Sequence, residues 1–199
     1  MINQNKLKTG AILLAAGSST RLGRPKQLLM FEEQTLLERS ISSILKSQID
    51  EFVIVLGGNA QEIQAQVDLS NFSLIVNHDW ELGMSCSMKL GLTYLISKYA
   101  IDQVVIILCD QPFVNEGLIN EIITKKENGI VACSYGDTVG VPALFDSKHF
   151  GELLTLQNKE GAKKIILRHL HQCDLIKFDL GSIDIDTEDD YQNLLKMDS

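Results

Sequence analysis

The sequence predicts an α/β fold in which helices cover both faces of a mostly parallel sheet. Strand-like and helix-like hydrophobic patterns alternate along the 199 residues. In addition, the strand-like runs at 11–15 and 104–109 are apolar throughout, as in strands buried on both faces. Such sheets bind ligands beyond the carboxyl ends of their strands. We expect residues 1–199 to form a single domain, with residues 1–8 as a flexible tail.

The first half of the chain begins with a predicted strand over Ala11–Ala15, which Gly17 ends. A loop rich in Gly, Ser and Arg follows. Thr35 and Glu38 then have the spacing of a capping box, and the apolar residues after them keep a helical period as far as Leu45. Further strands are predicted over 52–56 and 72–76, and further helices from Asn59 to about Val67 and from Ser85 to Tyr99.

The second half begins with the most apolar run of the chain, Val104–Cys109, which stops at Asp110 and Pro112. This pattern predicts a central parallel strand with a carboxylate at its carboxyl end. Helices are predicted over 115–126, 146–156, 160–170 and 187–197, and short strands near 130–133, 142–145 and 174–178.

Charge is unevenly distributed along the chain. The net charge of −8 argues against nucleic acid or an anionic membrane as a partner. Residues 1–30, however, contain five Lys or Arg residues and no acid. Two of these, Lys6 and Lys8, belong to the predicted tail, and the others favour a local anionic ligand. Because no apolar run reaches the roughly 18 residues of a membrane span and no secretory signal is present, we expect a cytoplasmic protein.

Cysteine and histidine residues give no metal-binding pattern. The four cysteines stand far apart, without zinc-ligand spacing, so we expect reduced thiols. His169 and His171 have no third ligand near them in the sequence, and we interpret them as surface or packing residues.

The strongest functional signal is the loop that follows the first strand. Small residues at 15–18 let backbone N–H groups approach a phosphate, and Arg21 and Lys26 add the positive charge that a triphosphate requires. The spacing is not that of a Walker A loop, since Pro25 precedes the lysine and no Ser or Thr follows it. A flexible surface loop with incidental Arg and Lys is the alternative.

This loop, with the sequence LAAGSSTRLGRPKQLL, resembles the N-terminal signature of the MobA-like nucleotidyltransferases, and most closely the molybdenum cofactor cytidylyltransferase branch. Later blocks are similar to that family in the same order: NHDWELGMSCSMKLGL, LCDQPFV, GVPALF and DIDTEDDY. The resemblance implies a three-layer α/β/α, Rossmann-like nucleotidyltransferase fold and Mg²⁺ as the cofactor.

The resemblance also implies roles for individual residues. Lys26, Arg21 and Asp110 are the expected catalytic residues. The expected nucleotide-binding residues are Ala15, Ala16, Gly17, Ser18, Arg21, Lys26, Asn77 and Gly83. Relatives that transfer GMP carry Gly where this sequence has Ala16, and those that transfer CMP carry Ala, so CTP is the expected donor.

Asp110 and Asp186 are the expected Mg²⁺ ligands. Asp110 follows a predicted buried strand, although a turn or helix-capping aspartate before Pro112 is the alternative. Asp186 lies in a run of acids at 184–190, and Thr187 with Asp190 has capping-box spacing, which accounts for the later acids as a helix start. Asp184 shares one face of an extended segment with Asp186 and is the weaker candidate.

The block after Gly83 is expected to bind the acceptor. Ser85 and Ser87 suit an anionic group, and Lys89 stands where many relatives carry Arg. Met84, Met88 and Leu92 have helical spacing and are expected to lie in the core.

The predicted function is Mg²⁺-dependent transfer of CMP from CTP to the terminal phosphate of a molybdopterin-type cofactor, with release of pyrophosphate. An acceptor phosphate is already anionic, so no general base is required. Two alternatives remain. The acceptor is a sugar phosphate or another phosphorylated small molecule, or the chain is a non-catalytic accessory protein that hands the cofactor to a molybdenum hydroxylase.

Overall fold

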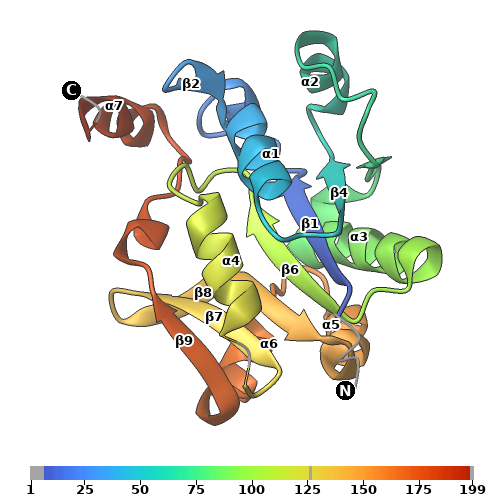
Figure 1. Cartoon of the computed structure of the whole chain (residues 1–199). Coiled ribbons are helices and arrows are strands. Elements are labelled where there is room, and N and C mark those ends of the chain that lie inside the picture. Colours follow the sequence, from blue (N-terminus) through green and yellow to red (C-terminus); the bar gives the residue numbers. More distant parts are fainter. Residues whose placement is uncertain (1–6, 126, 198–199) are drawn as a thin grey trace.

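A seven-stranded sheet forms the centre of the computed structural model, which describes residues 7–125 and 127–197 (Figure 1). Its order is β5-β4-β1-β6-β8-β7-β9. The strands are β1 Thr9–Ala15, β4 Glu51–Leu56, β5 Leu74–Val76, β6 Gln103–Leu108, β7 Ile130–Tyr135, β8 Thr138–Asp146 and β9 Cys173–Lys177. Only the pairings of β8, with β6 and β7, are antiparallel. The sheet is therefore mostly parallel, as predicted.

Helices cover both faces of this sheet (Figure 1). The α-helices are α1 Leu36–Lys46, α2 Ala60–Gln66, α3 Met84–Tyr99, α4 Glu116–Thr124, α5 Phe150–Thr155, α6 Lys163–Arg168 and α7 Glu188–Met197. Helices α1, α2, α4 and α7 contribute to one core, and α3, α5 and α6 to the other. This confirms the three-layer α/β/α arrangement. Within the described residues, no helix combines the length and the apolarity of a membrane-spanning segment.

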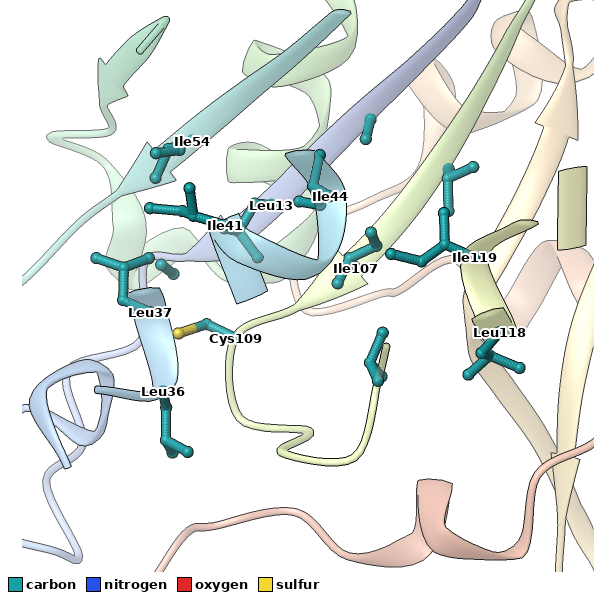
Figure 2. Close-up of a cluster of buried hydrophobic side chains, with 14 of the residues drawn as sticks. Leu13, Leu36, Leu37, Ile41, Ile44, Ile54, Ile107, Cys109, Leu118 and Ile119 are labelled. Atoms are coloured by element: carbon teal, nitrogen blue, oxygen red, sulfur yellow. The ribbon is translucent and has the colours of Figure 1, made fainter. Parts of the chain in front are cut away.

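The two cores follow from the alternation of side chains along β1. Ala11, Leu13 and Ala15 face one core, whereas Ile12 and Leu14 face the other, and all five are buried. Figure 2 shows the first core, in which Leu13, Ile54 and Ile107 from three adjacent strands pack under residues of α1 and α4. Burial on both faces explains why residues 11–15 of this strand are apolar throughout.

The observed starts of two helices agree with the sequence predictions, and those of two others differ from them. Thr35 forms a capping box at the start of α1, and Thr187 forms one directly before α7, as predicted. Asn59, in contrast, does not cap α2 with its side chain, which bonds to the carbonyl of Ser18 instead. Helix α3 begins one residue before Ser85, after Gly83.

Other elements differ from the predictions in extent. A short hairpin of β2 Met30–Phe31 and β3 Gln34–Thr35 was not predicted, because its turn uses positive φ angles at two glutamates instead of glycines. Strand β8 is longer than the predicted 142–145 because its pairing with β7 reaches to Thr138. The segment predicted as a helix from 146 starts with a 3₁₀ turn, Ser147–His149.

The predicted tail over residues 1–8 is wrong at Lys8. Its backbone N–H donates to Asp102 Oδ2 at 2.7 Å, and its carbonyl accepts from two backbone N–H groups before β6. Lys8 is thus fixed at the amino-terminal end of the sheet, directly before β1. Residues 1–6, which include Lys6, and residue 126 at the predicted end of one helix lie outside the described residues.

Helix α3 packs closely on the sheet at Gly91. A Cβ built there would lie 2.8 Å from Ile12 Cγ2, whereas one built at Gly151 in α5 meets nothing within 4 Å. We expect Gly91→Ala to lower the free energy of unfolding by about 1–3 kcal/mol through overpacking. Gly151→Ala is the matched control and should raise it by up to about 1 kcal/mol, since alanine favours helix. Urea denaturation measures both changes, and equal shifts in the same direction would contradict this packing.

Candidate active site

The loop that follows β1 is held in place by polar contacts with its own backbone. The buried Gln27 donates from Nε2 to the carbonyls of Ala15 at 2.8 Å and Gly17 at 3.1 Å. Ser19, with a φ of 54°, accepts from the backbone N–H of Lys26 at 3.0 Å. Asn59 binds the carbonyl of Ser18 from the neighbouring β4–α2 connection. The loop is therefore a fixed cradle, which disfavours the alternative of a flexible surface loop.

Glycines after β4 let this loop approach its neighbours. A Cβ at Gly57 would lie 2.4 Å from the carbonyl oxygen of Ala16, and one at Gly58 would lie 3.0 Å from the ring of Trp80. Both positions therefore require the absence of a side chain.

Lys26 is the centre of an ionic cluster. Its Nζ lies 2.5 Å from Asp110 Oδ2 and 2.8 Å from Asp186 Oδ1, and only 13% of its side chain is exposed. Burial alone would lower the pKa of Lys26, but the charges and hydrogen bonds of Asp110 and Asp186 outweigh it and raise that pKa. The hydrogen bond from Lys26 is the main reason that the pKa of Asp186 is lowered. Lys26 and Asp186 are therefore both charged at neutral pH.

The two arginines of the loop connect it to the start of α7. Arg21 Nη2 lies 2.5 Å from Asp186 Oδ2, and Arg24 Nη2 lies 2.7 Å from Glu188 Oε2. Arg24 also lies 5.4 Å from the centre of the Tyr191 ring, whose hydroxyl donates to the carbonyl of Met30 at 2.8 Å. These contacts bring the end of the described chain to the first loop.

The acidic segment before α7 lies beside the end of β6. The backbone N–H of Ile185 donates to the carbonyl of Asp110 at 3.2 Å, and the Ile185 side chain is fully buried. Asp184 and Asp186 on either side of it therefore share the other face, as the alternation predicted. Desolvation and the charges of Asp110 and Asp186 raise the pKa of Asp184. No ion pair of Asp184 is recorded among the described residues.

The carboxylates fit a divalent cation. Asp110 Oδ1 is buried and has no hydrogen-bond partner within the described residues, although buried acceptors are normally paired. Asp186 approaches the same ammonium as Asp110, so that a single cation already bridges the two groups. Two carboxylates with space for water and phosphate oxygens are a donor set that Mg²⁺ accepts.

A cavity of about 300 Å³ lies between the loop, the end of β6 and the start of α3. Its volume is at the lower end of the range for small-molecule sites. Eight predicted site residues line it: Ala15, Ala16, Gly17, Ser18, Lys26, Gly83, Ser87 and Asp110. The cavity therefore lies beyond the carboxyl ends of β1 and β6, where sheets of this type bind ligands.

Other predicted residues do not line this cavity. Asn77 is buried and donates to Ser87 Oγ at 2.9 Å, so it positions a lining residue. Ser85 donates to the carbonyl of Gln157 at 2.8 Å, and Lys89 to that of Leu156 at 3.0 Å. These two side chains hold the segment after α5, and their contact with an acceptor remains a prediction.

Sequence reasoning missed several residues of the cavity and misplaced one. Gln27, Trp80 and Cys109 line it but were not singled out. Met84 was expected in the core, yet its exposed fraction is 47% and it lines the cavity, whereas Met88 and Leu92 are buried as predicted. Met84 is the first residue of α3 and lies at the cavity, so the helical period of the buried residues does not extend to it. The polar residue Gln27, next to Lys26 in the sequence, could have indicated a side chain that anchors the loop from inside the protein.

Known proteins similar to this chain include curated relatives and solved structures. Nicotine blue oxidoreductase of Paenarthrobacter nicotinovorans is 32% identical over 139 residues, which cover 69% of this chain and 67% of the relative. Molybdenum cofactor cytidylyltransferase of Escherichia coli is 24% identical over 181 residues, which cover 90% and 92%. Rv0371c from Mycobacterium tuberculosis H37Rv superposes with a TM-score of 0.84 at 31% identity, over 96% of this chain and 98% of that one. Its complex with manganese gives a TM-score of 0.80 at 29% identity, over 95% and 98%.

The family model of the MobA-like NTP transferase domain matches residues 11–173. This range contains the cradle loop, Lys26 and Asp110, whereas Asp184 and Asp186 lie beyond it. The place of Asp186 at the site therefore depends on its ion pairs with Arg21 and Lys26. Since the match covers most of the sequence and the same loop and strand end line the cavity, this chain belongs to the MobA-like NTP transferase family.

Proposed function

We propose that this nucleotidyltransferase transfers CMP from CTP to the terminal phosphate of a molybdopterin-type cofactor and releases pyrophosphate. The observation that carries the proposal is the convergence of Lys26, Asp110 and Asp186 beside a cavity lined by Ala16, among other residues of the loop. In-line transfer of a nucleotidyl group requires positioning and charge neutralisation more than covalent chemistry by the protein. The similarity to a cytidylyltransferase of Escherichia coli supports the choice of reaction.

The residues of the loop bind and orient the triphosphate in this proposal. Ala16, Gly17 and Ser18 line the cavity, so that their backbone N–H groups would bind phosphate oxygens, and Arg21 and Lys26 would neutralise the charge of those oxygens. Both cations are paired with Asp186 in the structure, so the triphosphate exchanges places with a carboxylate. Cys109 also lines the cavity, but its thiol lies in the first core beside α1 (Figure 2). Burial raises the pKa of this thiol, so that it stays protonated and is not a nucleophile.

Asp110 and Asp186 would hold Mg²⁺ in this reaction. When bound, Mg²⁺ supplies charge neutralisation at the phosphate oxygens of the donor. The buried and unpartnered Asp110 Oδ1 supports this role. A relative of known structure, Rv0371c, has been solved in complex with manganese, which is consistent with divalent-cation binding in this family.

The acceptor is the least constrained part of the proposal. A transferase that acts on a sugar phosphate or another phosphorylated small molecule would have the same triphosphate site. A non-catalytic accessory protein of a molybdenum hydroxylase would bind the cofactor without turnover. Pyrophosphate release with CTP and purified cofactor distinguishes these functions. Pyrophosphate release only with another phosphorylated acceptor would show that the proposed acceptor is wrong. Binding of the cofactor without any pyrophosphate release would favour the accessory role. Because one relative is named an oxidoreductase, a redox assay on the same preparation completes the comparison.

Asp110→Ala should abolish pyrophosphate release while the protein stays folded. The substitution removes a proposed metal ligand, but Lys26 keeps its ion pair with Asp186. A coupled phosphate assay measures turnover, and circular dichroism checks the fold. Asp137→Ala, in the exposed turn between β7 and β8, is the matched control and should retain full turnover. Normal turnover in Asp110→Ala would refute the metal assignment.

Lys26→Met should separate metal binding from catalysis. Without the ammonium, Mg²⁺ no longer competes for Asp110 and Asp186, and its affinity should rise about 10-fold, or ~1.4 kcal/mol. Turnover should fall at least about 100-fold, since a group that stabilises transition-state charge is lost. Thermal shift against Mg²⁺ concentration gives the affinity. Lys46→Met on the exposed side of α1 should change neither quantity. Unchanged Mg²⁺ affinity in Lys26→Met would contradict the proposed exchange.

Ala16→Gly should reduce the preference for CTP over GTP. A methyl group at the cavity edge favours the smaller base, and its removal should shift the ratio of kcat/KM values by about 10-fold. Competition between the two nucleotides measures the ratio in both proteins. If the wild type prefers GTP, the base assignment is wrong, whereas the proposed transferase chemistry stands.

A further inference from the structure

We propose that His149, Glu152 and His169 form a second metal site, which binds a divalent transition-metal ion such as Zn²⁺. Within the described residues, one atom from each of these side chains lies within 4.8 Å of the other two. Two imidazoles and one carboxylate are a donor set that zinc binds in proteins, usually with water in the fourth position. The cluster has no part in the transferase chemistry proposed above.

The three residues lie around α5 and the end of α6, at the end of the sheet opposite the cavity. His149 ends the 3₁₀ turn after β8, Glu152 lies three residues later in α5, and His169 directly follows α6. The last residue of β8 pairs with Gln103, which is the first residue of β6. Asp110, in contrast, follows the carboxyl end of β6. In Figure 1, α5 accordingly lies near the start of β1, far from α7.

The two distances from the carboxylate to the imidazoles require only a small expansion around an ion. Glu152 Oε1 lies 3.1 Å from His149 Nδ1 and 2.8 Å from His169 Nε2. Ligand atoms of a tetrahedral zinc site lie about 3.3 Å apart, given bond lengths near 2.0–2.1 Å. The two rings meet edge to face with their centroids 4.9 Å apart, so both nitrogens already point at the same carboxylate.

The carboxylate has an outer-shell partner. Arg168 Nη1 lies 2.8 Å from Glu152 Oε2. Oε1 faces both imidazoles, and His169 Nε2 also lies 3.0 Å from Oε2. The hydrogen bond from His169, together with those from His149 and Arg168, lowers the pKa of Glu152 to about 2, against the effect of partial burial. Glu152 is thus ionised at neutral pH. An oriented and ionised carboxylate with a hydrogen-bonded second oxygen is typical of metal sites.

The donor set selects a different metal from the proposed active site. Imidazole nitrogens suit zinc, cobalt, nickel and copper, whereas Mg²⁺ prefers oxygen ligands. The side chains remain partly accessible, with exposed fractions of 11% for His149, 29% for Glu152 and 26% for His169. An ion can therefore enter from solvent and join the end of α6 to the start of α5.

The test is a titration of the full chain, freed of metal with a chelator, with Co²⁺ followed by displacement with Zn²⁺. One equivalent of Co²⁺ should give the visible absorption of a low-symmetry site without bands from sulfur ligands. His169→Gln and Glu152→Gln should weaken Zn²⁺ binding by about 100-fold, since even an outer-shell loss costs 10–100-fold. Arg168→Gln should weaken it by about 10-fold on the same basis.

His171→Gln is the matched control, because His171 is exposed two residues after His169 and belongs to no such cluster in the part of the chain that the structure describes. It should bind Zn²⁺ as the wild type does. Equal affinity in His169→Gln and His171→Gln would overturn the proposal. The absence of stoichiometric Co²⁺ or Zn²⁺ binding by the wild type would do so without reliance on any variant. Pyrophosphate release should be unchanged in His169→Gln, which keeps this site separate from the catalytic one.

Discussion

The charge balance around Lys26 is the constraint on which the site depends. One ammonium joins segments that lie 84 and 160 residues away in the sequence, at Asp110 and Asp186. In a position with little solvent, two facing carboxylates would repel each other without it. In the proposed reaction, the triphosphate uses the same ammonium. Binding of the proposed substrate would therefore exchange ionic partners, because each charged group that loses one contact needs another.

Much of the fold could be predicted because burial on both faces leaves a clear pattern. The runs that became β1 and β6 are apolar at every position, and the capping residues Thr35 and Thr187 mark their helices. The hairpin at 30–35 could not be predicted, because its glutamates adopt left-handed conformations that the chain imposes and that their residue type disfavours. The sequence pattern near Asp146 likewise did not distinguish a strand end from a helix start.

The candidate site was predictable where chemistry selects the residue type. Lys26 and Asp110 are charged groups next to buried strands, and the structure brings them together with Asp186. Ser85 and Lys89 were predicted from the same reasoning, but their polar atoms bind backbone carbonyls after α5. A hydroxyl or an ammonium group can equally well hold two segments of the fold together. The residue type alone therefore does not show whether the group binds a ligand or stabilises the fold. The cluster around Glu152 was missed because its members are separated in sequence.

The contacts between the first loop and α7 have a consequence for synthesis. Asp186, Glu188 and Tyr191 reach back to Arg21, Arg24 and Met30. On a ribosome, the cradle loop and Asp110 emerge long before their last acidic partner. A nascent chain of about 180 residues thus carries a lysine with only one of its two carboxylate partners and a loop whose arginines lack their acidic partners. The site is assembled only once Asp186 and α7 have been added, so that a product terminated before them should fold its sheet and yet lack an assembled site.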